Sequence, residues 1–203
     1  MKQICRSPVR RRSHACALLG KYMIVHGGIE VRKTRSQPLI YDIEKNQWSS
    51  PFVRDFPALS HHKLVNPFLN KKLRKNKQFE ECLYMFGGLN EKGIAKNQMY
   101  KIKILNETEL SCEKIQTKNP PLPRHSFILE SLDLNTLVLY GGKHHDEIDN
   151  EFTIKGIYSD LHLFSIDTST WTIPVLPFKL SNRFGMCSTS DRNKVYIFGG
   201  SLL

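Results

Sequence analysis

The chain has 203 residues, of which 40% are hydrophobic and 24% are charged, and its formal net charge is +11. This length and apolar content are enough to bury a sizeable core. The positive charge favours acidic partners or acidic surfaces and says little about the fold.

The N-terminal part holds a nearly apolar stretch, residues 15–25, which Lys21 interrupts. It is too short to cross a bilayer, and no clear signal peptide is present. The five cysteines are scattered without CxxC spacing, which favours buried thiols over disulfides or a zinc site. We therefore expect a cytoplasmic protein with no transmembrane segment, no metal and no cofactor.

Short apolar runs rich in Val, Ile, Tyr and Phe alternate with polar turns along the chain, and no long helical pattern is present. Four of these runs end in two adjacent glycines, and the intervals between the pairs are 60, 54 and 58 residues. The pairs are Gly27-Gly28, Gly87-Gly88, Gly141-Gly142 and Gly199-Gly200. A strand that ends in a double glycine at this period is typical of a propeller blade.

Each glycine pair belongs to a unit of four predicted antiparallel strands. Before the glycines, a hairpin opens at Arg12, Arg124 or Arg183, which lie 15, 17 and 16 residues ahead of the first glycine. In the second unit, residues 60–65 form the first strand, and a polar insertion separates it from the second. After the glycines, two more strands are expected within residues 38–48, 98–115 and 160–171. The units span residues 12–57, 58–120, 121–178 and, in part, 179–203.

These features resemble the kelch repeat family. The resemblance covers nearly the whole chain and rests on the double glycines and on the residues that follow them: Tyr41, Asp42, Trp48, Phe164, Asp167 and Trp171. It implies one all-β, kelch-type β-propeller region over residues 1–203. In such a fold the glycines let neighbouring backbones approach, and aromatic side chains, including Trp48 and Trp171, fill the space between blades.

The predicted ring does not close, because the sequence supplies four inner hairpins and three outer ones, about three and a half blades. Closed propellers have four to eight blades. An open arc exposes strand edges and apolar faces. We expect either that the chain is part of a longer protein or that it associates with another chain through its open blade edges.

The predicted strands place their connections on two faces. Turns inside the hairpins share the first face, and connections between second and third strands and between blades share the second face. Arg12, Arg124 and Arg183 are expected on the second face near the channel mouth, where three guanidinium groups could grip an acidic peptide. The alternative is that each arginine bonds backbone or an aspartate of the adjacent blade. His14 and His125 accompany two of them as structural hydrogen-bonding groups.

A basic insertion is expected on the first face and contains Lys71, Lys72, Arg74, Lys75 and Lys77. It either contacts an acidic partner or is a solvated loop. Nucleic acid is not expected as a partner, because no nucleic-acid-binding motif is visible. Residues 143–156, which include His144, His145 and four carboxylates, either coordinate a metal or form an exposed loop.

The sequence shows no catalytic triad arrangement, phosphate-binding loop or metal-ligand spacing, so an enzyme is not expected. The resemblance implies a non-catalytic interaction module, a scaffold or adaptor that presents propeller loops to a partner protein. Two alternatives stay open. One is a charge-driven scaffold for acidic cytoskeletal or membrane surfaces, and the other is a propeller enzyme.

Overall fold

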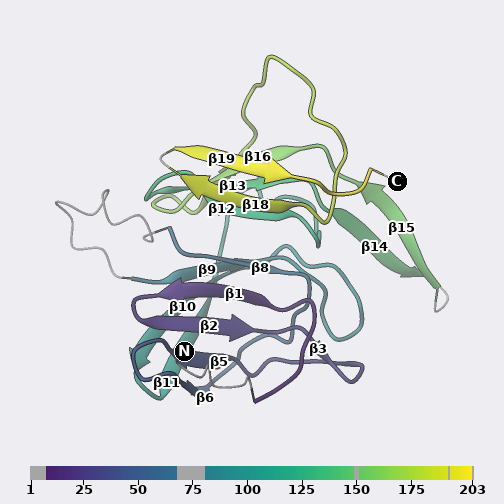
Figure 1. The fold of residues 1–203 in the computed structure, drawn as a ribbon. Helices are drawn as coiled ribbons and strands as arrows, with labels where there is room; N and C mark the ends of the chain where they lie inside the picture. Colours follow the sequence, from purple (N-terminus) through teal and green to yellow (C-terminus); the bar gives the residue numbers. More distant parts are fainter. Residues whose placement is uncertain (1–7, 68–80, 149–150, 192, 203) are drawn as a thin grey trace.

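A computed structural model describes residues 8–67, 81–148, 151–191 and 193–202, with the backbone alone for residues 145–148 and 151–155. The regular elements of the described residues are all β-strands, which form successive antiparallel sheets (Figure 1). The predicted all-β propeller architecture is therefore confirmed. In the part of the chain that the structure describes, no helix is long and apolar enough to cross a membrane.

Three blades are complete, and each has four antiparallel strands. Blade 1 is built from β1 (Ala15–Leu19), β2 (Tyr22–His26), β5 (Leu39–Asp42) and β6 (Gln47–Ser49). Blade 2 is built from β8 (Lys63–Val65), β9 (Leu83–Phe86), β10 (Met99–Asn106) and β11 (Glu109–Ile115). Blade 3 is built from β12 (Ile128–Ser131), β13 (Thr136–Tyr140), β16 (Leu161–Ser165) and β17 (Thr170–Thr172). Blade 4 has two strands, β18 (Cys187–Asp191) and β19 (Lys194–Phe198).

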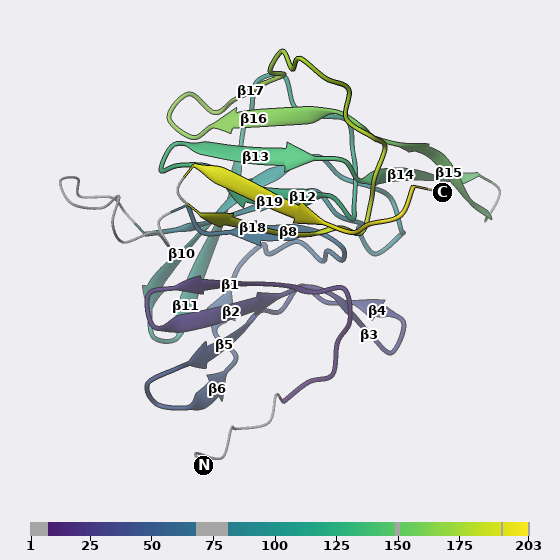
Figure 2. The same ribbon diagram turned by 45° about the horizontal axis from the view of Figure 1, so that its top comes forward.

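Two hairpins project from the same side of the molecule, which is the second face (Figure 2). One joins β3 (Ile29–Glu30) to β4 (Lys33–Thr34), and the other joins β14 (Lys143–Ile148) to β15 (Glu151–Ile157). Residues 143–156, expected to be an exposed loop or a metal site, therefore lie largely in a β-hairpin. Strand β14 pairs with β15 along this segment, and the pairing contains a bulge between His144 and His145.

The linkers between complete blades also pair as strands. Strand β7 (Phe52–Val53), which follows blade 1, pairs in parallel with β11, the outermost strand of blade 2. Lys118, which follows blade 2, makes the same parallel contact with Thr170 of blade 3. Each linker thus adds to the outer edge of the next blade.

The glycine pairs tie each blade to the next. The second glycine donates its N–H to a carbonyl of the following blade, as the pairs Gly28–Leu59, Gly88–Arg124 and Gly142–Arg183 show, at 2.8, 2.9 and 2.7 Å. At Gly87, φ is +65°, and a Cβ would lie 2.7 Å from Phe127 Cε1 and 2.9 Å from the Arg124 carbonyl. Only glycine meets both demands, the left-handed backbone and the close approach.

The apolar core lies between the blades. Trp171 of β17 is fully buried and packs on Phe86 and Phe164, with ring centroids 5.0 and 4.8 Å apart. Trp48 takes the equivalent outer position in blade 1, where it is half-buried and lies 5.1 Å from the Tyr41 ring. Both tryptophans therefore lie at the outer part of a blade and pack against aromatic neighbours.

Gly87→Ala is expected to lower the free energy of unfolding by about 2 kcal/mol, because the new Cβ forces Phe127 and the Arg124 backbone to move. Gly199 takes the same position in blade 4, also with positive φ, but a Cβ there would meet nothing within 4 Å. Gly199→Ala should therefore cost only the backbone strain, about 1 kcal/mol. Urea unfolding of both variants measures this. An equal loss of unfolding free energy in the two variants would show that the close contact between blades is not the reason why glycine is required at position 87.

Candidate functional site

The innermost strands of the four blades meet around a channel. Residues of β1, β8, β12 and β18 line a cavity of about 610 Å³. Hydrogen bonds in its wall include those from the Ser188 hydroxyl to Glu130 Oε1, at 2.7 Å, and from Asn66 Nδ2 to the Leu18 carbonyl, at 2.6 Å. No group of three or more His, Cys, Asp or Glu side chains that could hold a metal is present among the described residues. The side chains of residues 145–155 lie outside the described part of the chain.

At the second face, a chain of backbone hydrogen bonds runs along the mouth of this channel from blade 1 to blade 4. His61 N donates to Ser13 O, Ser126 N to His61 O, and Gly185 N to Ser126 O, at 2.8, 3.2 and 2.7 Å. All four residues have positive φ, although three of them are not glycine. Such left-handed conformations persist only where the surroundings hold them. The mouth, a hollow of about 190 Å³, is thus a fixed frame.

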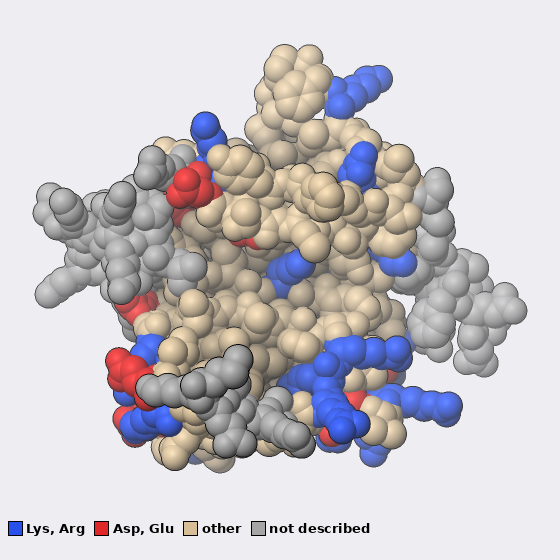
Figure 3. All heavy atoms as spheres, in the orientation of Figure 1, with Lys and Arg blue, Asp and Glu red and all other residues tan. Residues whose placement is uncertain are grey.

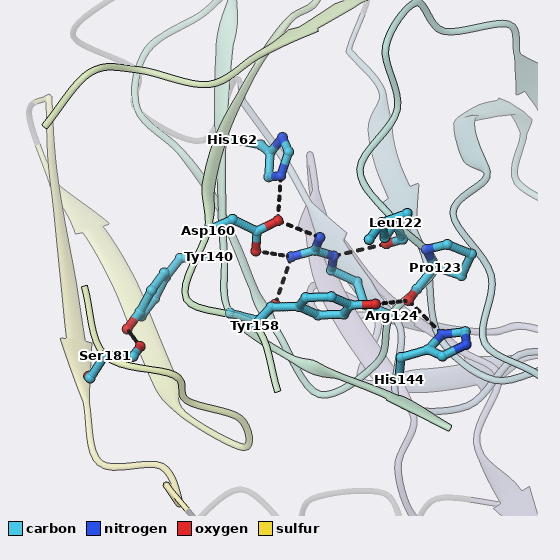
Figure 4. A network of polar contacts seen from close by, with 10 residues as sticks. Leu122, Pro123, Arg124, Tyr140, His144, Tyr158, Asp160, His162 and Ser181 are labelled. Atoms are coloured by element: carbon cyan, nitrogen blue, oxygen red, sulfur yellow. Dashed lines mark hydrogen bonds and ion pairs between the residues drawn. The ribbon is translucent and has the colours of Figure 1, made fainter. Parts of the chain in front are cut away.

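Arg124 forms a closed polar network beside the mouth (Figure 4). Its side chain is fully buried and makes two hydrogen bonds to Asp160, of 2.6 and 2.8 Å. It also donates to the carbonyls of Gly141 and Leu122, and it lies 4.1 Å from the centre of the Tyr158 ring. The hydrogen-bonding capacity of Arg124 is therefore largely taken up inside the protein.

Asp160 is held ionised by this network. Partial burial opposes its charge, but hydrogen bonds from Arg124 and from His162 Nε2 (2.7 Å) outweigh burial and hold the pKa of its carboxyl far below the usual value. The pair Arg124–Asp160 consequently joins the entry of the inner hairpin of blade 3 to the start of its third strand.

The arginine equivalent to Arg124 in blade 1 is Arg11, whereas the sequence spacing pointed to Arg12. Arg11, Arg124 and Arg183 each donate Nη1 to the carbonyl of the first glycine of their own blade, at 3.1, 3.1 and 3.0 Å. Arg12 instead pairs its backbone with Ile29, as His125 pairs with Lys143 and Phe184 with Ser201. Its side chain is exposed at the second face.

Four exposed cations, Arg10, Arg12, Arg32 and Lys33, lie on the second-face side of blade 1; we call them the blade-1 basic patch. Lys and Arg side chains gather at the lower right of the space-filling view, over β3 (Figure 3). Arg35 is nearby but forms an ion pair of 2.6 Å with Glu30. The four patch residues make no ion pair with the other described residues.

One patch residue, Arg32, lies in a strained turn. The two residues that join β3 to β4, Val31 and Arg32, have φ of 42° and 70°. Two-residue hairpin turns of this kind strongly prefer Asn-Gly, and a β-branched residue at positive φ is unusual. The side chain of Val31 is 91% exposed at the tip. Residues held in such costly conformations cluster at active sites, ligand clamps and switch regions, which makes this turn a candidate for binding.

Sequence reasoning named Arg12 but missed Arg32 and Lys33. The signal was present, since the residues after Gly28 read IEVRK, but no turn-forming pair marks a hairpin there. The basic insertion with Lys71, Lys72, Arg74, Lys75 and Lys77 lies outside the described residues.

Between blades 1 and 2 the structure also buries two histidines. His26 Nδ1 and His62 Nε2 are 3.1 Å apart, and both rings are inaccessible to solvent. Burial, and then the charge of Arg11, lowers the pKa of His26 to about 4. Burial also lowers the pKa of His62, with smaller contributions from His26, His61, His14 and Lys63. The pair is therefore neutral at pH 7.

Repeated four-stranded sheets around a channel, joined by glycine pairs, define a β-propeller. The family model described as the Attractin/LZTR1 beta-propeller matches residues 1–201, and the chain belongs to this family. It is also similar to Kelch domain-containing protein 1 of Homo sapiens, with 25% identity over 217 residues, and of Mus musculus, with 24% identity over 218 residues. These matches cover 95% of this chain and 50% of each relative, so the chain spans about half the length of the curated relatives it matches. The kelch resemblance is thus confirmed, and kelch-type propellers are in general protein-interaction modules rather than enzymes.

Proposed function

We propose that this chain is a non-catalytic interaction module, of scaffold or adaptor type, whose second face binds a protein partner with an acidic surface. The observation that carries the proposal is the blade-1 basic patch: four exposed cations on the second-face side of blade 1, which make no ion pair with the other described residues. Carboxylates of a partner would form ion pairs with the four cations of the patch, and the side chain of Val31 would supply an apolar contact.

The other predicted binding residues take different parts in this proposal. Arg124 is buried against Asp160, and Arg183 donates to Gly199 O and Ser181 Oγ, so we assign both to shaping the mouth. The basic insertion around Arg74 stays a second candidate contact on the first face. The four cysteines among the described residues, Cys16, Cys82, Cys112 and Cys187, form no disulfide with one another, which supports a reducing compartment such as the cytoplasm. Cys16 and Cys187 are exposed, so the expectation of buried thiols is wrong for these two.

The double variant Arg12→Glu and Arg32→Glu is expected to weaken binding of an acidic peptide at least tenfold at about 0.1 M salt. The probe is a fluorescently labelled peptide in which Asp and Glu alternate with Leu, followed by anisotropy. The control, Lys114→Glu with Lys194→Glu, makes the same change of charge at two exposed lysines outside the patch and should alter the affinity less than about twofold. Equal weakening by both variants would show that net charge, not the patch, attracts the peptide.

Anionic surfaces are the alternative ligand. The same variants are mixed with vesicles of phosphatidylserine and phosphatidylcholine in a sedimentation assay. The proposal expects little vesicle binding by the wild-type chain, because one exposed valine is a small apolar anchor. The proposal would be contradicted if the wild-type chain bound vesicles strongly but did not bind the peptide. If the double variant Arg12→Glu and Arg32→Glu abolished this vesicle binding, the ligand of the patch would be a membrane surface and not a protein.

A further inference from the structure

The boundary between blades 1 and 2 differs from the next boundary in one contact of its core. Between blades 2 and 3, Phe86 packs on Phe127, with ring centroids 5.6 Å apart. Between blades 1 and 2, the same two places hold His26 and His62. Gly27 shows the correspondence, because a Cβ there would lie 2.5 Å from His62 Cε1, just as Phe127 lies against the first glycine of blade 2. A polar and titratable pair thus replaces an apolar contact between two blades.

The hydrogen bonding of this histidine pair is incomplete. His26 Nδ1 and His62 Nε2 share one hydrogen bond of 3.1 Å. The other two ring nitrogens, His26 Nε2 and His62 Nδ1, are buried without a hydrogen-bond partner among the described residues. Because nearly all buried polar groups in proteins are hydrogen-bonded, two unpaired nitrogens weaken this boundary relative to a pair of phenylalanines.

The groups around the pair oppose its protonation. The side chains that act directly on the two rings are all cationic or able to become so, namely Arg11 on His26, and His14, His61 and Lys63 on His62. Glu30 acts on Arg11 and is itself paired with Arg35. Backbone groups at Ser36 and Pro57 favour a proton on His26, but burial and the guanidinium group outweigh them. A proton on either ring is therefore stabilised only where water can reach the ring.

Two backbone hydrogen bonds cross the boundary beside the pair. Gly28 N donates to Leu59 O at 2.8 Å, and His61 N donates to Ser13 O, also at 2.8 Å. Gly28 directly precedes β3, so the first of these bonds holds the root of the β3–β4 hairpin, which carries Arg32. Water can reach both imidazole rings only if the two blades separate here, and this separation breaks both bonds.

We propose that this boundary is an acid-sensitive joint: below neutral pH, blade 1 separates from blade 2 locally, around His26 and His62, while the other blade boundaries stay closed. In the open joint both imidazole rings are hydrated and can take up protons, which favours the open form. Since the root of the β3–β4 hairpin lies at the joint, the position of the blade-1 basic patch becomes dependent on pH.

Hydrogen exchange resolved to single amides by NMR tests the proposal on the 203-residue chain at about pH 7.5 and 5.5. Protection is taken relative to the intrinsic exchange rate at each pH. We expect the protection of the Gly28 and His61 amides to fall about tenfold for each histidine that the opening hydrates, because an exposed histidine has a pKa of about 6.5. The control amides, Gly88 and Ser126, donate across the boundary between blades 2 and 3 at 2.9 and 3.2 Å. At pH 5.5 they should stay at least about tenfold better protected.

The double variant His26→Phe and His62→Phe copies the boundary between blades 2 and 3. In this variant the protection of the Gly28 and His61 amides should be nearly the same at both pH values. If it does not fold, His26→Tyr with His62→Met takes its place, since Tyr140 and Met186 hold these positions at the boundary between blades 3 and 4 and share one apolar cluster.

Two results would overturn the proposal. The first is equal protection of all four amides in the wild-type chain at pH 5.5, because the joint would then open only when the whole protein unfolds. The second is a fall in the protection of the Gly28 and His61 amides that is as large in the histidine-free variant as in the wild type, because the two imidazole rings would then not be the trigger.

Discussion

Replacing Arg124 with alanine is expected to lower the free energy of unfolding by about 3 kcal/mol, at the lower end of the cost of breaking a buried ion pair, because the Asp160 side chain stays 32% exposed to solvent. Asp160 would keep His162 as a neighbour but lose both bonds from the guanidinium group. The carbonyls of Gly141 and Leu122 would lose a donor as well. For a domain of this size, the loss amounts to a fall in Tm of about 10 °C.

Arg183→Ala is the matched control for this prediction, because Arg183 has the same place in the repeat. It bonds a glycine carbonyl but no carboxylate, and it is partly exposed. Its replacement should cost less than about 1 kcal/mol. Urea unfolding of the two variants gives the comparison. Similar small losses in both would mean that the Arg124–Asp160 pair does not hold blade 3 together.

The stability of the protein is expected to fall as the pH is lowered from 6.5 to 4. Because the folded protein holds the pKa of His26 at about 4, the unfolded chain binds more protons in this window, and protonation favours unfolding. A shift from 6.5 to about 4 corresponds to about 3 kcal/mol lost by pH 4. His62, whose pKa is also lowered, adds to the loss. The low pKa of Asp160 has its effect only below the ordinary pKa of aspartate, outside this window.

The chain offers its own control for the histidine pair. At the boundary between blades 2 and 3 the same two positions hold Phe86 and Phe127, whose rings pack edge to face at 5.6 Å. The double variant His26→Phe and His62→Phe copies this contact without a titratable group. Its stability, measured by urea unfolding at several pH values, should be nearly flat between pH 7 and 4.5. If the unfolding free energy of the variant fell with decreasing pH as steeply as that of the wild type, the histidine pair would not be the cause of the pH dependence.

The sequence was sufficient to predict the blades, because the glycine pairs and the strands around them recur at nearly constant spacing. Even the short strand β8, separated from β9 by an insertion, could be placed by its position in the repeat. The exposed edge at β19 followed from counting strands. These features depend on local pattern and on repetition, which one sequence displays directly.

Other features depend on register, which spacing alone does not determine. The distance from arginine to glycine varies by one or two residues between units, so Arg12 was aligned with Arg124 where the structure aligns Arg11. The bond to the Gly27 carbonyl settles the register. Likewise, the correspondence of His26 and His62 with Phe86 and Phe127 becomes visible only when the blades are superposed through their glycine contacts. The β3–β4 hairpin was missed because Val31-Arg32 is not a turn-forming pair.

The chain repeats one four-stranded blade three times, and among the described residues the fourth blade consists of the hairpin β18–β19 alone, with β19 at its edge. Hydrogen exchange of the monomeric 203-residue chain, read by mass spectrometry, tests this most directly. Strands β9 and β13 are paired on both sides and should exchange slowly, whereas part of β19, which pairs with β18 alone among the described residues, should exchange quickly. Equal protection of β19 and β13 in the free monomer would contradict the account, because it would mean that the edge is already paired.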